Sequence, residues 1–156
     1  MSREEAFGDD CFCCQECGTL FRTPLYTISS EFERSHFYDG ERIPEIQIRG
    51  AEAIASCCSL ECLGKQRDKI LLSENVRATY PGIGPVEHCS RCGEMVDATQ
   101  FHLTWVEEVA ACQWGKSLQI QPQDARTLAV LCISCCPTKE STQQSRASMD
   151  RRPNNQ

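Results

Sequence analysis

The chain has 156 residues, a formal net charge of −6 and 13 cysteines, which allows one domain or two small ones. It has no apolar run long enough to cross a bilayer, and the acidic start MSREEAFGDD does not resemble a secretory signal. We therefore expect a cytoplasmic protein, in which paired cysteines more often bind metal than form disulfides.

Two strands joined by a tight turn are predicted after the first cysteine group, CCQECG. Apolar residues alternate over Leu25–Ile28, which is typical of a half-buried strand. Asp39-Gly40 predicts a hairpin turn, because glycine accepts the positive φ that such turns need. IPEIQI would then form the return strand, and AEAIAS leads into the second cysteine group.

A helix is predicted directly after Cys58, in SLECLGKQRDKILLSE. Its apolar stems share one face, Ser59 is a plausible N-cap, and we expect the helix to end near Glu74. The next segment, NVRATYPGIGPVEH, contains two prolines and two glycines and predicts a linker.

The second half of the chain repeats the first at an offset of 75 residues, which becomes 74 after the hairpin turn. CSRCG matches CQECG, FHLT matches YTIS so that Leu103 falls on Ile28, and Cys132 falls on Cys58. Gly115 would occupy the second turn. This ordered recurrence indicates an internal duplication. The second half has no equivalent of the helix, because a proline follows its last cysteine at once.

These features predict a small α+β fold with two β-hairpin-rich modules in tandem and one helix after the first. The modules cover residues 9–75 and 88–137, joined by the linker 76–87. A tail over 138–156 has almost nothing apolar to bury and is predicted to be disordered. The Pro/Gly linker further predicts that each module unfolds independently.

Zinc is the metal that the cysteine spacing favours. A C-x-x-C turn places two sulfurs on one side of a tight loop, and four thiolates satisfy the tetrahedral preference of zinc without water. Each half of the chain offers two cysteine pairs. We therefore predict two zinc ions that stabilise the fold, bound by Cys14, Cys17, Cys58 and Cys62, and by Cys89, Cys92, Cys132 and Cys135.

Other cysteines leave alternatives open. Cys11, Cys13 and Cys57 crowd the first site, and Cys136 competes with Cys135 at the second. Cys112 has no sequence partner and sits in an apolar stretch, so we interpret it as a small buried hydrophobe.

The segment CSLECLGKQ, in which C-S-x-x-C opens a helix, resembles the C-terminal half of treble-clef zinc fingers of the MYND and TRASH types. The two CxxCG segments resemble the knuckles that treble clefs share with zinc ribbons. The sequence departs from these families in the roughly 40 residues between ligand pairs and in lacking a second helix. Members of these families mostly bind proteins or nucleic acids, so the resemblance implies a binding function.

An enzyme is not expected. Catalytic zinc sites keep an open position and usually include histidine or carboxylate. The three histidines, His36, His88 and His102, stand in no catalytic motif, and the chain has no phosphate-binding loop.

The net charge favours a protein partner over a nucleic acid, because a negative protein repels phosphate unless a basic face dominates. KQRDK is the best basic stretch, but acidic residues dilute it. Some aromatic residues would be available to stack on bases: Tyr26, Phe37, Tyr38, Trp105 and Trp114. We therefore predict a protein-interaction adaptor or regulator, with nucleic-acid binding as the alternative. A thiol-rich metal buffer or redox sensor is the second alternative.

Overall fold

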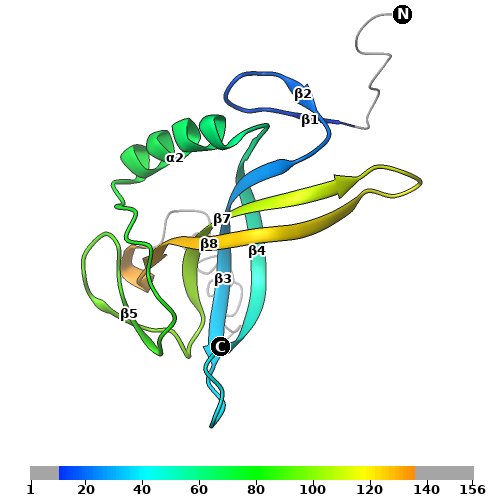
Figure 1. The fold of residues 1–156 in the computed structure, drawn as a ribbon. Helices are drawn as coiled ribbons and strands as arrows, with labels where there is room; N and C mark the ends of the chain where they lie inside the picture. Colours follow the sequence, from blue (N-terminus) through cyan, green and yellow to red (C-terminus); the bar gives the residue numbers. More distant parts are fainter. Residues whose placement is uncertain (1–10, 136–156) are drawn as a thin grey trace, which may run out of the picture.

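The structure is a computed structural model that describes residues 11–135. Its centre is a four-stranded antiparallel sheet in the order β4-β3-β7-β8 (Figure 1). Two small hairpins, β1 with β2 and β5 with β6, precede the two halves of this sheet. Over the described residues the strands are β1 Phe12–Cys13, β2 Leu20–Phe21, β3 Leu25–His36, β4 Glu45–Cys57, β5 Val86–His88, β6 Met95–Asp97, β7 His102–Gln113 and β8 Gln119–Leu131. The helices are α2 Leu60–Glu74 and the short 3₁₀ helix η1 Ile133–Cys135. The predicted small α+β class is confirmed.

The central sheet joins the two halves of the chain. β3 pairs with β7 from Leu25, opposite Ala110, to Glu33, opposite His102. Figure 1 shows the hairpins β3–β4 and β7–β8 meeting along this seam and diverging towards their tips. Buried residues of both halves, such as Ile28 and Leu128, belong to one core cluster. The two predicted modules therefore share one sheet and one core, which argues against the prediction that they unfold independently. The boundaries of the modules stay a prediction.

Each long hairpin carries two β-bulges at corresponding places. The registers shift at Arg49 and Ile54 of β4, and at Gln123 and Leu128 of β8. Each bulge inserts one unpaired residue and increases the local twist, which helps to explain the divergence of the hairpins.

The registers also correct the sequence comparison of the first strands. Ile28 lies opposite Ala55 and Trp105 lies opposite Ala129, so Ile28 corresponds to Trp105 and not to Leu103. The predicted match of the return strands, Ala55 with Ala129, agrees with these registers. The duplication itself stays a hypothesis.

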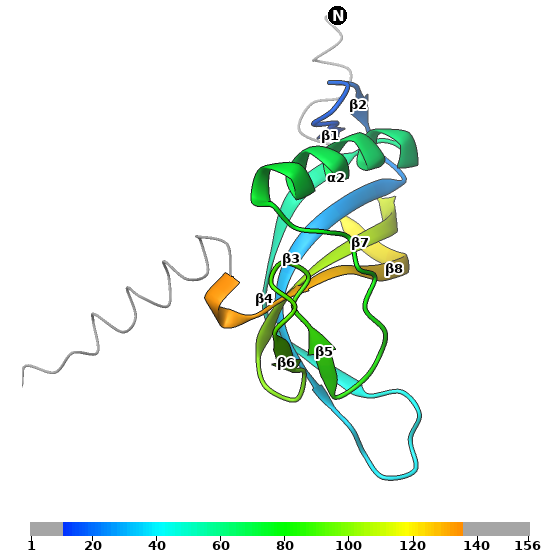
Figure 2. The same ribbon diagram turned by 90° about the vertical axis from the view of Figure 1, so that its left-hand side faces the viewer.

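Helix α2 has the predicted bounds and the predicted cap. The Ser59 side chain accepts a hydrogen bond from the Cys62 amide at 3.1 Å. The helix ends at Glu74, and the next residue, Asn75, has a left-handed conformation and donates its amide to the carbonyls of Leu71 and Leu72. Figure 2 shows α2 lying across the strands at one end of the sheet, where it buries Leu63.

The predicted turns and linker take ordered conformations. Gly40 has a φ of 82°, as the hairpin prediction requires, whereas Gly115 lies in the β7–β8 turn without positive φ. In the linker, Val76 is buried, and the amides of Thr79 and Tyr80 donate to the Leu128 carbonyl at 3.1 and 3.2 Å. The linker therefore packs along the outer edge of β8. The predicted tail lies outside the described residues, and no described helix is long and apolar enough to cross a membrane.

Candidate metal centres

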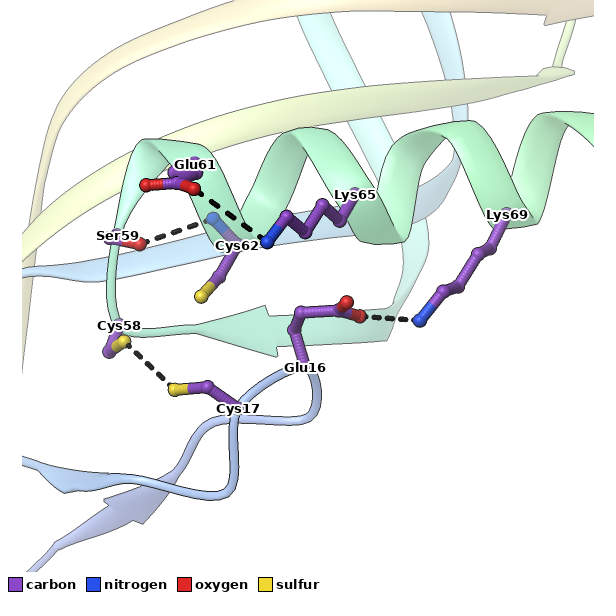
Figure 3. Close-up of polar contacts among 8 residues, drawn as sticks. All are labelled: Glu16, Cys17, Cys58, Ser59, Glu61, Cys62, Lys65 and Lys69. Atoms are coloured by element: carbon purple, nitrogen blue, oxygen red, sulfur yellow. Dashed lines mark hydrogen bonds and ion pairs between the residues drawn. The ribbon is translucent and has the colours of Figure 1, made fainter.

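The first candidate metal centre brings together two cysteines that precede the β3–β4 hairpin in the chain and two that follow it. Cys14 and Cys17 lie in the loop between β1 and β2, Cys58 follows β4, and Cys62 lies in the first turn of α2. Their four sulfur atoms lie within 4.8 Å of one another, and the Sγ atoms of Cys17 and Cys58 are 3.6 Å apart. Figure 3 shows Cys17, Cys58 and Cys62 converging at the start of the helix.

The second candidate metal centre has the same construction. Cys89 and Cys92 lie in the loop between β5 and β6, Cys132 follows β8, and Cys135 lies in η1. These sulfur atoms also lie within 4.8 Å of one another, and the Sγ atoms of Cys92 and Cys132 are 3.6 Å apart.

A glycine closes the knuckle of each centre. Gly18 and Gly93 have φ values of 74° and 79°, a conformation that other L-residues rarely adopt. The Gly18 amide donates to the Cys14 carbonyl at 2.9 Å, and the Gly93 amide donates to the Cys89 carbonyl at 2.9 Å. The loops therefore hold the two cysteines of each C-x-x-C pair on one side of a tight turn.

The residue after the first cysteine attaches each knuckle to an outer strand of the sheet. The Gln15 amide donates to the Ser56 carbonyl at 3.0 Å, and the Gln15 side chain accepts from the Ser56 amide at 3.1 Å. The Ser90 amide donates to the Val130 carbonyl at 2.7 Å, and Ser90 Oγ accepts from the Val130 amide at 3.0 Å. Sequence reasoning missed both residues, because glutamine and serine share no motif that marks this role.

The first knuckle is also fastened to the helix that carries Cys62. Glu16 accepts a hydrogen bond from Lys69 Nζ at 2.7 Å (Figure 3). It accepts a second one from Gln66 Nε2 at 2.8 Å. The Lys69 and Gln66 contacts lower the pKa of Glu16. This contact joins residues far apart in the sequence, so no local pattern predicts it.

Both sulfur sets fit a tetrahedral metal ion. A metal–sulfur distance of about 2.3 Å requires sulfur atoms about 3.8 Å apart at the corners of the tetrahedron. The 3.6 Å separations and the 4.8 Å limit are compatible with this geometry. A disulfide would require about 2.05 Å, and the eight cysteines of the two sets are free thiols. Each set can therefore hold one metal ion.

The protein environment prepares the first ligand of each centre for metal binding. Burial opposes ionisation of Cys14, but the backbone amides of Cys17, Cys58 and Glu16 lower its pKa to about 6. Burial likewise opposes ionisation of Cys89, and the amides of Cys132, Cys92 and Arg91 lower its pKa to about 6.

One partner in each set, Cys58 in the first and Cys135 in the second, holds its proton more tightly. Burial and the neighbouring thiols raise the pKa values of Cys58 and Cys135 to about 12. Since metal ligation requires thiolates, metal binding must displace these protons.

The remaining described cysteines lie outside the two sets. Cys57 is fully buried beside the first centre, and burial together with the charge of Cys14 raises its pKa to about 12. Cys13 is exposed, with Sγ 3.7 Å from the Gly18 carbonyl, and Cys112 is buried in β7, as expected. Cys136 lies outside the described residues.

The three histidines also lie outside both sets. His102 is buried, and its Nδ1 lies 2.8 Å from the Gln100 carbonyl, while His88 Nδ1 lies 3.3 Å from the Gly93 carbonyl. His36 lies near the Gln47 side chain on the β3–β4 hairpin. Over residues 11–135, each set consists of four cysteines.

Comparisons of the chain with protein-family models, with curated proteins and with solved structures found no match. The geometry alone therefore characterises the site: two four-cysteine sets are placed for metal binding, which is consistent with zinc-finger-like modules.

Proposed function

We propose that this is a non-enzymatic zinc protein of the cytoplasm, in which two structural zinc ions hold a scaffold that binds another protein. The observation that carries the proposal is the pair of four-cysteine sets, each assembled from two distant segments. Four thiolates complete the preferred coordination of zinc, so a site of this kind serves folding and not turnover.

A structural role also suits the construction of the two centres. Zinc contributes roughly 10–16 kcal/mol of apparent binding free energy in small fingers near neutral pH, which exceeds the usual stability margin of such domains. Cys58 and Cys132 directly follow β4 and β8, so zinc would fix the end of each outer strand to its knuckle.

A protein partner is supported over a nucleic acid by the pairing of the basic residues on α2. Lys65 pairs with Glu61, Lys69 with Glu16 and Arg67 with Glu107. Among the aromatic residues considered for base stacking, Trp105 is 2% exposed and belongs to the core, so that expectation is wrong for Trp105.

Native mass spectrometry of the full chain, purified without added metal, tests the zinc proposal. We expect two zinc ions per chain and eight thiols protected from alkylation. A zinc content of one or fewer in the folded protein would overturn the proposal.

Cobalt substitution tests the structural role of the metal. Intense charge-transfer bands of a closed four-thiolate site are expected, whereas an exchangeable water would reopen the enzymatic alternative.

Affinity capture with the zinc-loaded chain, followed by crosslinking, tests the adaptor role. A specific partner protein should be captured, and a chelator should abolish capture together with native structure. Binding of RNA or DNA at moderate salt without protein capture would favour the nucleic-acid alternative.

A further inference from the structure

A cleft of about 630 Å³ lies between the two long hairpins. Glu107 and Glu108 are consecutive in β7, so they point to opposite faces of the sheet. Glu107 contacts Arg67 of α2, which places Glu108 and the cleft on the face away from the helix. The cleft is lined by Glu31, Glu33, Ile46, Ile48, Tyr80, Pro81, Ile83, Val106, Glu108, Ala125, Arg126 and Thr127.

Three carboxylates form the acidic part of the cleft. Glu33 is only 7% exposed, and Glu31 and Glu108 are partly buried. Burial raises the pKa of Glu31 to about 7, with a further contribution from Glu33, and burial also raises the pKa values of Glu33 and Glu108. The glutamates therefore lack the solvation that an exposed carboxylate has, and a cation placed beside them would favour their ionised form.

The cleft does not supply that cation itself. Within residues 11–135, none of the three glutamates forms an ion pair with a lysine or arginine. Arg126 lines the cleft, but its Nη2 is 2.8 Å from Glu107 Oε2, and its guanidinium lies over the Tyr80 ring. The charge of Arg126 is therefore already paired with Glu107.

The walls of the cleft are apolar. Ile46 and Ile48 of β4 are 50% and 51% exposed, and Ile83 of the linker is 69% exposed. Val106 and Pro81 complete this lining. Exposed β-branched side chains gathered around one cleft are typical of a surface that another molecule covers.

A metal ion does not suit this cleft. Oxygen-binding cations require several oxygen ligands around one point. Over the described residues, the carboxylate oxygens of these glutamates do not converge as the sulfur atoms of the two cysteine sets do. An organic cation attached to an apolar body satisfies both the acidic and the apolar lining.

We propose that this cleft binds a lysine or arginine side chain of a protein partner, with the partner's neighbouring apolar residues covering Ile46, Ile48 and Ile83. The inference rests on the proposed adaptor function and specifies where the partner docks and what chemistry it presents. Glu31, Glu33 and Glu108 would accept charge-assisted hydrogen bonds from the partner's cation, which are stronger than neutral ones.

Selection of random peptides displayed on phage, against the zinc-loaded full chain, tests the proposal. Enriched sequences should carry lysine or arginine next to aliphatic residues. In fluorescence polarisation, the Glu31→Gln/Glu33→Gln/Glu108→Gln variant should bind the enriched peptide about tenfold or more weakly, because the charge-assisted hydrogen bonds to the partner's cation are lost. An Ile46→Ser/Ile48→Ser variant should also bind more weakly.

Controls separate a local effect from misfolding. Glutamine matches the shape of a protonated glutamate, and each variant must retain two bound zinc ions by native mass spectrometry. Glu61→Gln removes a carboxylate from the exposed face of α2 and should leave peptide binding unchanged.

Several results would overturn this assignment. Enriched peptides without basic residues, or an enriched peptide that the triple glutamine variant binds as tightly as the wild type, would place the docking site elsewhere. The adaptor function would survive that result, because the chain would still bind a peptide. Failure of the adaptor function would appear separately, as absence of a captured partner for the folded wild type.

The chain's own basic tail is an alternative occupant. Tighter peptide binding by an Arg151→Ser/Arg152→Ser variant than by the wild type would assign the cleft to the tail and overturn the proposal for a partner.

Discussion

Cys57 and Cys58 are neighbours in the sequence, but the structure gives them different surroundings. Cys58 contributes its sulfur to the first four-cysteine set, whereas Cys57 is buried in the core and lies outside that set. Leu131 occupies the corresponding place before Cys132 and is buried in the same core. A buried leucine at this place indicates that the second half needs an apolar side chain there and not a ligand.

Alanine substitution separates these two roles. Cys58→Ala should remove the ion from the first centre, because it deletes one of four ligands. Cys57→Ala should retain two ions and lower the free energy of unfolding by on the order of 1 kcal/mol, the cost of a small cavity. Native mass spectrometry and urea denaturation measure both effects. Loss of an ion from the Cys57→Ala protein would show that Cys57 is a ligand.

Glu31 gives the fold a specific pH dependence. Burial, then the hydrogen bond and charge of Glu33, raise its folded-state pKa to about 7, whereas the unfolded value is about 4.3. The folded chain therefore binds this proton more tightly than the unfolded chain. The resulting stabilisation is fully present below the unfolded pKa and is lost as pH rises through about 7.

Glu31→Gln tests this dependence, because glutamine mimics the protonated carboxyl group at every pH. The variant should be more stable than the wild type at pH 8, and the difference should shrink towards pH 6. Urea denaturation of both zinc-loaded proteins measures it, and comparing the two cancels the common effect of protons on the metal sites. A difference that does not vary with pH would contradict the prediction.

At the scale of secondary-structure elements, Glu107 connects α2 to the second hairpin. Its side chain is 5% exposed and contacts Arg67 Nη1 of α2 at 2.7 Å and Arg126 Nη2 of β8 at 2.8 Å. The hydrogen bond with Glu107 raises the pKa of the Arg67 guanidinium. A buried carboxylate between two cations of different elements fixes where the helix lies on the sheet.

Removing this carboxylate should destabilise the protein. Glu107→Ala leaves the partly buried Arg67 without its buried anion, and breaking a buried ion pair in this way costs about 3 kcal/mol. Urea denaturation measures the effect. The exposed pair of Glu61 and Lys65 provides the matched control, since Glu61→Gln should change stability by less than about 1 kcal/mol. Equal effects of the two substitutions would mean that Glu107 does not fix the helix.

Local patterns predicted the elements but not their assembly. Ser59 and the apolar face of the following segment defined α2, and Gly40 defined the first turn, because capping and positive φ are properties of a few neighbouring residues. The pairing of β3 with β7 was not predicted, since alternating apolar residues mark a strand without naming its neighbour. The same limit applies to Glu107, whose arginine partners lie far away in the sequence.

At the candidate metal centres, too, the sequence predicted some features and not others. The spacing of the cysteines led to the eight that the structure gathers into two sets. It did not reveal that Gln15 and Ser90 attach the knuckles to β4 and β8. Nor did it give the alignment of the first strands: Ile28 is 11 residues after Cys17, whereas the corresponding Trp105 is 13 residues after Cys92, and a shift of two residues leaves the alternation of a strand unchanged.

At the scale of the whole molecule, the two metal centres stand at the outer strands of one sheet. The first knuckle is bonded to β4 and the second to β8, and the β3–β7 seam lies between them. Loss of the second centre would release β8 and then expose the β7 side of the seam. Since the core includes Ile28, Ala55 and Leu63 from the first half with Trp105 and Leu128 from the second, the first half should lose packing as well.

We therefore expect Cys89→Ser to weaken both halves, in contrast to the independence that the Pro/Gly linker suggested. Amide hydrogen exchange should show reduced protection in β3 as well as in β7, and the remaining zinc ion should leave at a lower chelator concentration than in the wild type. The physical reason is that removal of one structural zinc costs several kcal/mol, which a shared sheet transmits through its backbone hydrogen bonds. Met95→Ala, at an exposed position of β6 directly after this knuckle, is the matched control and should leave exchange in β3 unchanged. If the Cys89→Ser protein instead keeps wild-type protection in β3 and α2 and wild-type zinc affinity at the first centre, the halves are independent, and the β3–β7 seam contributes little to stability.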